Sequence, residues 1–304
     1  MLKHDLTTAP ISTELAGRSW RARKLLLTLR HFAATKPLGA VGGAILIFLI
    51  SVALLAPLIS PHDPIEPNAN LTYAGPSLGY LLGNDHIGRD VLSRLFHGAR
   101  ISLYVGGASV GIGITLGALL GIISAYSGGI FDLLFQRLVD ALIAFPTIIL
   151  ALAIMSALGG SPENVIIALV AVLAPSSART VRSQVLSLKE WDFITAARAI
   201  GASPTRIILR HIVPNCLPTY IILLTLTLGL AITAEASLSF LGVGVPPDVP
   251  TWGGMLTNAS QSFVVGSPWL AIYPGVALAL VVFGSNLLGD ALRDVLDPRL
   301  RGTR

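Results

Sequence analysis

The chain has little of what a soluble protein or an enzyme of the common hydrolytic classes requires. Charged residues make up only 12% of its 304 residues, about half of the fraction in soluble domains. The single cysteine, Cys216, excludes an internal disulfide and offers no metal cluster. The sequence contains no Gly-x4-Gly-Lys-Ser/Thr, Gly-x-Ser-x-Gly or His-Glu-x-x-His motif. These absences predict that the chain performs no ATP chemistry and argue against an intramembrane hydrolase.

Apolar residues dominate instead, at 53% of the chain, with a mean hydropathy of +0.74. A helix needs about 20 apolar residues to cross a bilayer. The sequence predicts an all-α integral membrane protein with six spans: Leu38–Ile59, Ile101–Tyr126, Leu138–Leu158, Val165–Arg182, Leu217–Leu241 and Ala271–Leu292. Because Pro175 and a polar run interrupt the fourth, we expect Val165–Ala174 to be its membrane half and the rest to emerge toward water as a helix. We therefore expect a basic N-terminal segment, residues 1–37, followed by a six-helix transmembrane domain, residues 38–304.

Basic residues are distributed unevenly between the two sides that six spans create. The first 37 residues hold seven Lys or Arg, residues 175–215 hold six, the tail from Asp290 holds four, and Arg137 adds one. The opposite loops hold only three: Arg89, Arg94 and Arg100. Since Lys and Arg accumulate in cytoplasmic loops, this asymmetry predicts that both termini are cytoplasmic. The net positive charge then reflects topology, and we expect no binding of nucleic acid. The basic lead could also form an amphipathic helix on the anionic leaflet, although we favour a simple anchoring role.

A polar, basic stretch, Leu188–Asn215, separates the fourth and fifth spans and is far longer than a connection requires. Its first half carries apolar residues at helical spacing: Phe193, Ile194, Ala197 and Ile200. Gly201 then predicts a helix stop, Ser203 an N-cap and Pro204 the first position of a second helix. We expect that helix to end at Pro214, with apolar residues on one side and Arg206 and Arg210 on the other. A helix–turn–helix of this size at a membrane surface predicts a docking site for a partner.

The two long outer loops differ in character. In the first, Asp85, His86, Arg89 and Asp90 precede a short amphipathic helix. A metal site would need a more convincing set of three or four ligands, so we favour an ion-paired capping structure in which Asp90 supplies negative charge to the first turn of that helix. The second loop, Gly242–Trp269, is rich in proline and glycine and has no basic residue. We expect it to form a shaped, fairly rigid surface.

Glu235, in the fifth span, is the clearest ionisable residue inside the predicted membrane region. Such residues are costly in lipid and are functional candidates by default. One hypothesis places Glu235 on a translocation path, facing a cationic group. The alternative, which we favour, is a buried carboxylate satisfied by neighbouring hydroxyl or backbone groups. Six glycines along the second span indicate close helix packing, which could also serve a moving interface: Gly106, Gly107, Gly111, Gly113, Gly117 and Gly121.

The polar stretch resembles the EAA loop of importer-type ABC transporter permeases, whose pattern is Glu-Ala-Ala, three residues, Gly, and an apolar-x-Pro ending about ten residues later. Here the pattern stands as Thr195-Ala196-Ala197, Gly201 and Ile212-Val213-Pro214, with Thr195 in place of the glutamate. The rest of the chain is similar to the C-type permease of dipeptide and oligopeptide importers, a family that also includes nickel and glutathione systems. The similar stretches are LGNDHIGRDVLSRLFHGARISL, GGIFDLLFQRLVDALIAFP, EASLSFLGVGVPPDVPTWGGML and NLLGDALRDVLDPRL.

The resemblance implies a non-enzymatic permease in a bacterial plasma membrane, embedded in the lipid bilayer, that forms half of a translocation path with a homologous second permease. Two cytoplasmic ATPase subunits would bind ATP and Mg, and a soluble substrate-binding protein would dock outside, so we expect no cofactor and no metal in this chain. The ATPase-coupling residues would be Thr195, Ala196, Ala197, Gly201, Ala202, Ser203, Pro204, Arg206 and Pro214. The residues expected to face the binding protein are Asp85, Arg89, Asp90, Asp248 and Trp252.

The predicted cargo is a di- or oligopeptide, with nickel, glutathione or another small solute as alternatives. A stand-alone channel or secondary transporter is a remote alternative. It would be expected to show inverted repeats, broken helices at the midplane and several buried charges. The sequence shows one buried carboxylate and no visible repeat.

Overall fold

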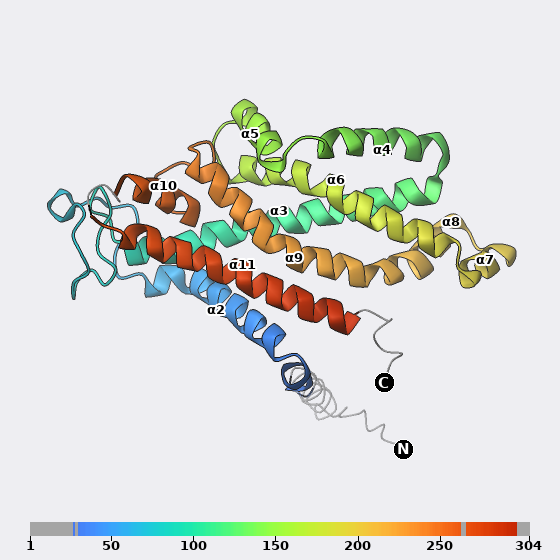
Figure 1. The fold of residues 1–304 in the computed structure, drawn as a ribbon, viewed down its shortest axis with the longest axis horizontal. Coiled ribbons are helices and arrows are strands. Elements are labelled where there is room, and N and C mark those ends of the chain that lie inside the picture. Colours follow the sequence, from blue (N-terminus) through green and yellow to red (C-terminus); the bar gives the residue numbers. More distant parts are fainter. Residues whose placement is uncertain (1–26, 28–29, 263–265, 297–304) are drawn as a thin grey trace, which may run out of the picture.

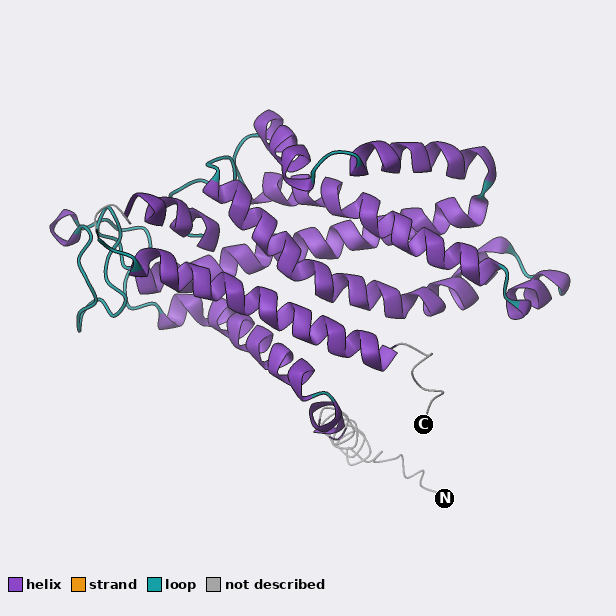
Figure 2. Ribbon diagram, viewed as in Figure 1, coloured by secondary structure: helices purple, strands orange, loops and turns teal. Residues whose placement is uncertain are grey.

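The computed structural model describes residues 27, 30–262 and 266–296, and within these residues every regular element is helical. The long helices run roughly side by side along the long axis of the molecule (Figure 1). Long loops gather at the end where α2 (Pro37–Ile59) leads toward α3 (Val91–Ser127), as Figure 2 shows. Most of the basic N-terminal segment lies outside the described residues, and of the expected amphipathic helix, residues 20–36, only residues 27 and 30–36 are described, with 30–35 helical. The all-α fold is confirmed.

Five helical stretches are long and apolar enough to cross a membrane unaided. They are α2, α3, α6 (Pro162–Lys189), the continuous run Pro204–Phe240 and α11 (Trp269–Leu296). A bent pair, α4 (Gly129–Ile143) and α5 (Thr147–Leu158), which meet at 92°, makes a sixth span if the two helices cross the membrane as one. The expected third span, Leu138–Leu158, is therefore interrupted by a sharp bend. Pro146 explains the break, because proline lacks an N–H and disfavours helical backbone in the residue before it.

Three other boundaries differ from the expected ones. The short amphipathic helix and the second predicted span are one helix, α3, with Asp90 as its N-cap. Helix α6 continues through Pro175, as expected, but runs past both ends of the expected span, Val165–Arg182. The second outer loop contains a helix that the sequence analysis missed, α10 (Trp252–Ser262). Its glycines and polar residues give a weak apolar pattern, which is why periodicity did not reveal it.

The core centres on α3 and α6, which pack against each other along most of their length. Two of the six glycines noted above on α3, called the glycine stripe from here on, allow the two helices to approach closely. A Cβ at Gly117 would collide with the carbonyl oxygen of Ala174 on α6, and a Cβ at Gly121 with that of Ala178. Gly106 instead faces Ile232 of α9 (Val213–Phe240). This packing holds the outer loops at one end of the molecule and the elements α7 (Asp192–Ala199) and α8 (Pro204–Ile207) at the other (Figure 1).

Candidate functional site

The stretch from Leu188 to Asn215, called the coupling loop from here on, has a fixed place against the helices. Ile194 and Ala197 of α7 are buried in a cluster with residues of α3, α6 and the start of α9. That cluster includes Ala118, Ile122, Val181, Val185, Leu188, Ile207, Ile212 and Cys216. Burial of this apolar face holds α7 to the bundle. The opposite face of α7 stays exposed.

The turn between α7 and α8 has the geometry that the sequence predicts. Gly201 adopts a left-handed backbone, with φ at +79°, a conformation that is costly for most side chains. The amide of Ala202 donates to the carbonyl of Ala197 at 3.0 Å, which closes the end of α7 as in a Schellman motif. Ser203 caps α8 by accepting from the amide of Arg206 at 3.4 Å, and Pro204 lies in its first turn. The predicted stop and start are confirmed.

The second helix of the coupling loop does not end at Pro214, and that expectation is wrong. It continues from α8 through a π-helical turn, Ile208–Ile212, directly into α9. The ring of a proline inside a straight α-helix collides with the carbonyl four residues earlier. Here the wider π turn lets the amide of Val213 reach the carbonyl of Ile208, so the helix passes Pro214 unbroken.

The predicted coupling residues divide by exposure. Ala197 is buried and Ala202 is half-buried. The others are exposed: Thr195, Ala196, Gly201, Ser203, Pro204, Arg206 and Pro214. Ile200 belongs to the apolar residues at helical spacing, yet it is 85% exposed and lies one residue beyond the end of α7. Trp191 is 51% exposed and is not part of the periodic pattern. Both Ile200 and Trp191 are therefore apolar surface residues.

At the other end of the molecule, Asp85 organises the first outer loop. Its carboxylate accepts from the amides of Ile87 and Arg89, both at 3.0 Å, and from Nε of Arg89 at 2.7 Å. Burial lowers the pKa of the neighbouring His86 imidazole, so at pH 7 arginine supplies the positive charge beside Asp85. Asp85 and Arg89 are 7% and 5% exposed. Both side chains are used within the loop and expose little surface, and their expected contact with a binding protein stays a prediction.

Asp90 and Trp252 are buried as well, at 2% and 1% exposure. Asp90 caps α3 by accepting from the amides of Leu92 and Ser93 and from the Ser93 hydroxyl at 2.6 Å. The indole of Trp252 donates to the carbonyl of Leu95 at 3.1 Å. Neither side chain is exposed, and of the five candidates for this role only Asp248 is. The capping role predicted for Asp90 is confirmed.

Glu235 is fully buried between α9 and α3. Its two carboxylate oxygens accept from the hydroxyls of Ser102 at 3.0 Å and Ser239 at 2.9 Å. The amide of Trp252 also donates to the Ser102 hydroxyl, at 3.3 Å. One carboxylate thus links α3, α9 and the start of α10.

A groove of about 410 Å³ runs between the α4–α5 elbow, α6 and α9. Its walls are mostly aliphatic, with hydroxyl groups from α6 and α9 that include Ser176, Thr227, Thr233 and Ser237. Ala234 and Ser237 line it, whereas Glu235 between them in sequence is bonded to α3. Residues on both sides of the 92° bend line the groove, among them Leu142, Ile143, Thr147 and Ile148.

Comparison with known families agrees with this geometry. Residues 113–302 match the family described as the binding-protein-dependent transport system inner membrane component. The chain belongs to this family. Residues 30–76 of the permease match the N-terminal transmembrane domain of oligopeptide transport permease C, so the C-type resemblance is confirmed. The permease is therefore a multi-pass membrane subunit of an ABC importer.

Individual relatives cover most of the permease. It is 42% identical over 264 residues to the dipeptide transport system permease protein DppC of Alkalihalophilus pseudofirmus. This match covers 87% of this chain and 86% of the relative. It is 43% identical over 277 residues to the glutathione transport system permease protein GsiD of Escherichia coli O6:K15:H31, with 90% and 88% covered. Its fold is similar to a chain of the MetNI methionine ABC transporter in an inward-facing conformation, with a TM-score of 0.55 and 22% identity. That match covers 68% of this permease and 97% of the other chain.

Proposed function

We propose that this permease forms one half of the translocation path of an ATP-driven importer and that its coupling loop docks on one of two cytoplasmic ATPase subunits. The observation that carries the proposal is the way the loop is attached. Its buried face packs on α6, and its second helix is continuous with α9. A push on the exposed tip therefore reaches two membrane helices without passing through a flexible segment.

The exposed surface of the coupling loop suits a protein partner. Ile200 and Trp191 offer apolar anchors beside the polar and basic groups of Thr195, Ser203 and Arg206. Thr195 replaces the glutamate of the EAA pattern, but the first turn of α7 already carries Asp192, whose charge favours a helix N-terminus. We infer that α7 does not depend on a carboxylate at Thr195 and that contact with the ATPase rests on shape and apolar area.

We further propose that the groove beside the α4–α5 elbow faces the second permease and forms one wall of the path. Its aliphatic walls and hydroxyl oxygens suit a small peptide, which carries both apolar side chains and amide groups. Relatives named for dipeptide and glutathione transport support this cargo class. Glu235 is assigned a structural role, because its oxygens are bonded to hydroxyls outside the groove.

The remaining parts of the proposal concern orientation and partners. Both termini and the coupling loop lie in the cytoplasm of a bacterium, as the distribution of Lys and Arg indicates. A soluble binding protein delivers cargo at the opposite end, where the long loops gather (Figure 2). Uptake of labelled dipeptides, glutathione and nickel by the assembled importer would separate the cargo alternatives.

The docking role is tested at Gly201, where a matched pair of substitutions separates charge from backbone strain. Asn and Asp have the same size and both tolerate a left-handed backbone better than most residues. A Cβ at Gly201 meets no atom within 4 Å, so neither side chain clashes, and both variants carry a similar strain from the left-handed backbone. We expect Gly201→Asp to lose ATPase subunits on copurification and to lose transport, because the charge must be desolvated on docking.

Gly201→Asn should keep most of both properties, and both variants should reach normal membrane levels. Full transport and full copurification with Gly201→Asp would refute the docking role. Equal loss in the two variants would show that strain at the turn, rather than contact with the ATPase, causes the defect.

A further inference from the structure

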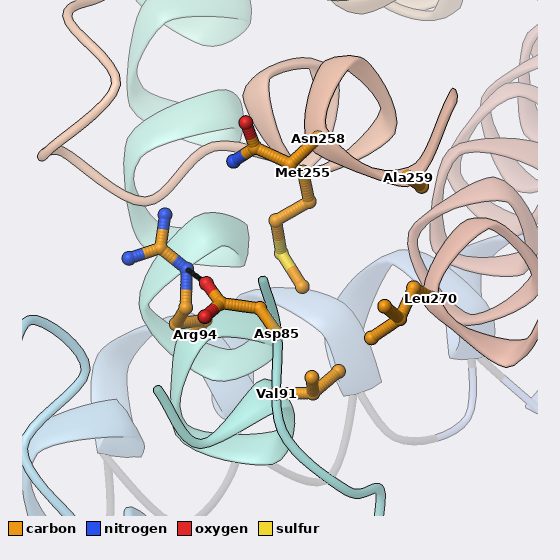
Figure 3. Close-up of a pocket in the computed structure, with 7 residues that line it drawn as sticks. All are labelled: Asp85, Val91, Arg94, Met255, Asn258, Ala259 and Leu270. Carbon is orange, nitrogen blue, oxygen red and sulfur yellow. Dashed lines mark ion pairs between the residues drawn. The ribbon is translucent and has the colours of Figure 1, made fainter. Parts of the chain in front are cut away.

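The two outer loops meet at one buried arginine, Arg94 in the first turn of α3 (Figure 3). Its side chain is 2% exposed. Nη1 donates to the carbonyl of Pro64 in the first loop at 2.9 Å, and Nη2 makes a longer contact of 3.5 Å to the carbonyl of Pro247 in the second loop. Nε lies 3.7 Å from Oδ2 of Asp85. One guanidinium thus contacts three separate segments.

Arg94 is not the main ion-pair partner of Asp85. Arg89 already donates to the same oxygen, Oδ2 of Asp85, at 2.7 Å, against 3.7 Å for Arg94. Arg94 is therefore a second cation beside a carboxylate that is already paired. Burying it is costly unless its other donors are satisfied, and the carbonyls of Pro64 and Pro247 satisfy them. The geometry points to a role in holding loops together.

The chemistry of the loops explains why arginine fits this place. Proline has no N–H, so the segments Pro61–Pro67 and Pro246–Pro250 have few amide donors and offer mainly carbonyl acceptors. A guanidinium presents five donors in a rigid planar fork and can reach two acceptors on opposite sides. A lysine ammonium is compact and cannot reach both carbonyls in the same way.

The residues that follow the two contacted carbonyls face outward. Ile65 and Glu66 come directly after Pro64 and are exposed, and Asp248 comes directly after Pro247 and is also exposed. Asp248 also lies close enough to Arg94 to interact with it electrostatically. The position of Arg94 thus sets the spacing between exposed groups on two loops that are far apart in sequence.

We propose that Arg94 is a positioning residue that clamps the two outer loops into one surface, on which the soluble binding protein of this importer docks. The proposal rests on the proposed function for the identity of the partner. The clamp itself rests on the contacts of Arg94 alone. A pre-organised surface binds more tightly than loops that must be ordered on contact.

The clamp is tested by a distance measurement that needs no binding protein. Spin labels are attached to cysteines at Glu66 and Asp248, in a Cys216→Ser background, in the assembled importer in lipid nanodiscs. We expect a narrow distance distribution in the parent and a clearly broader one in Arg94→Lys and Arg94→Met. Arg100→Lys is the matched control, because Arg100 is an exposed arginine on the same helix, and it should stay narrow. A narrow distribution in both Arg94 variants would overturn the clamp.

The docking half is tested by titrating the unlabelled importer with its own binding protein and measuring ATP hydrolysis. In Arg94→Lys the half-saturating concentration should rise about tenfold, as loss of pre-organisation predicts, while the rate at saturation changes little. An unchanged half-saturating concentration would overturn docking, whether or not the rate at saturation falls. If the parent importer shows no stimulation at all, the proposed function fails, and the spin-label measurement still decides the clamp.

Discussion

Replacing Gly117 tests whether the close approach of α3 to α6 holds the fold together. A Cβ at Gly117 would collide with the carbonyl oxygen of Ala174 and lie 2.8 and 2.9 Å from Cβ and Oγ of Ser177. In Gly117→Val the two helices must separate, which also weakens the bond from the Ser177 hydroxyl to the carbonyl of Ile114, now 3.0 Å long. Overpacking costs about 1–3 kcal/mol, and a hydrogen bond lost without replacement adds about 1 kcal/mol. We expect a total destabilisation of about 2–4 kcal/mol.

The same helix offers the control. A Cβ at Gly107 meets no atom within 4 Å, so Gly107→Val changes only the helix propensity, by a few tenths of a kcal/mol in the stabilising direction. The assay is the thermal unfolding of the purified permease, together with its level in the membrane. We expect Gly117→Val to unfold at a clearly lower temperature than the parent and Gly107→Val to unfold near the parent. Equal unfolding temperatures for the two variants would refute the idea that glycines such as Gly117 stabilise the fold by letting α3 and α6 approach closely.

Two further predictions concern topology and the buried carboxylate. In a Cys216→Ser background, a cysteine at Asp248 should react with an impermeant thiol reagent added outside intact cells, and one at Ser187 should not; both positions are exposed, and reversed labelling would overturn the orientation. Glu235→Gln should keep transport of neutral and charged cargo and change stability by less than about 1 kcal/mol, because the Ser102 and Ser239 hydroxyls can bond to an amide as well as to a carboxylate. Selective loss of cargo with a free amino group would show instead that the carboxylate faces the path.

The parts of the fold that could be read from the sequence are those governed by local chemistry. The turn at Gly201 followed from a residue that accepts a left-handed backbone and from a serine cap. The break at Pro146 and the passage of the helix through Pro175 could not be told apart, since the same residue type stands in both. Which outcome occurs depends on packing: α6 is held along α3 by the Ser177 bond and the glycine contacts, whereas α4 and α5 have an exposed groove at their junction.

The burial of charged residues in the first outer loop also could not be predicted from residue type. Asp85, Arg89 and Asp90 have the composition of a surface patch, but their polar groups are bonded within the loop. Burial of that kind depends on partners distant in sequence, such as Pro64 and Pro247 around Arg94. Residue type predicts that a charge needs a partner. It does not predict whether the partner belongs to the same chain.

The unbroken helix from Pro204 to Phe240 has a mechanical consequence. At about 1.5 Å per residue, its 37 residues extend roughly 55 Å, well beyond a hydrocarbon core of about 30 Å. A rod of that length, packed against α3 and α11, would act as a lever if its Pro204 end lies in the cytoplasm, as proposed above. An inward push on that end would then tilt the helix and shift its other end, which carries Glu235 and its bond to Ser102, in the opposite direction. Opposite motion at the two ends of a single helix would open one side of the groove while it closes the other.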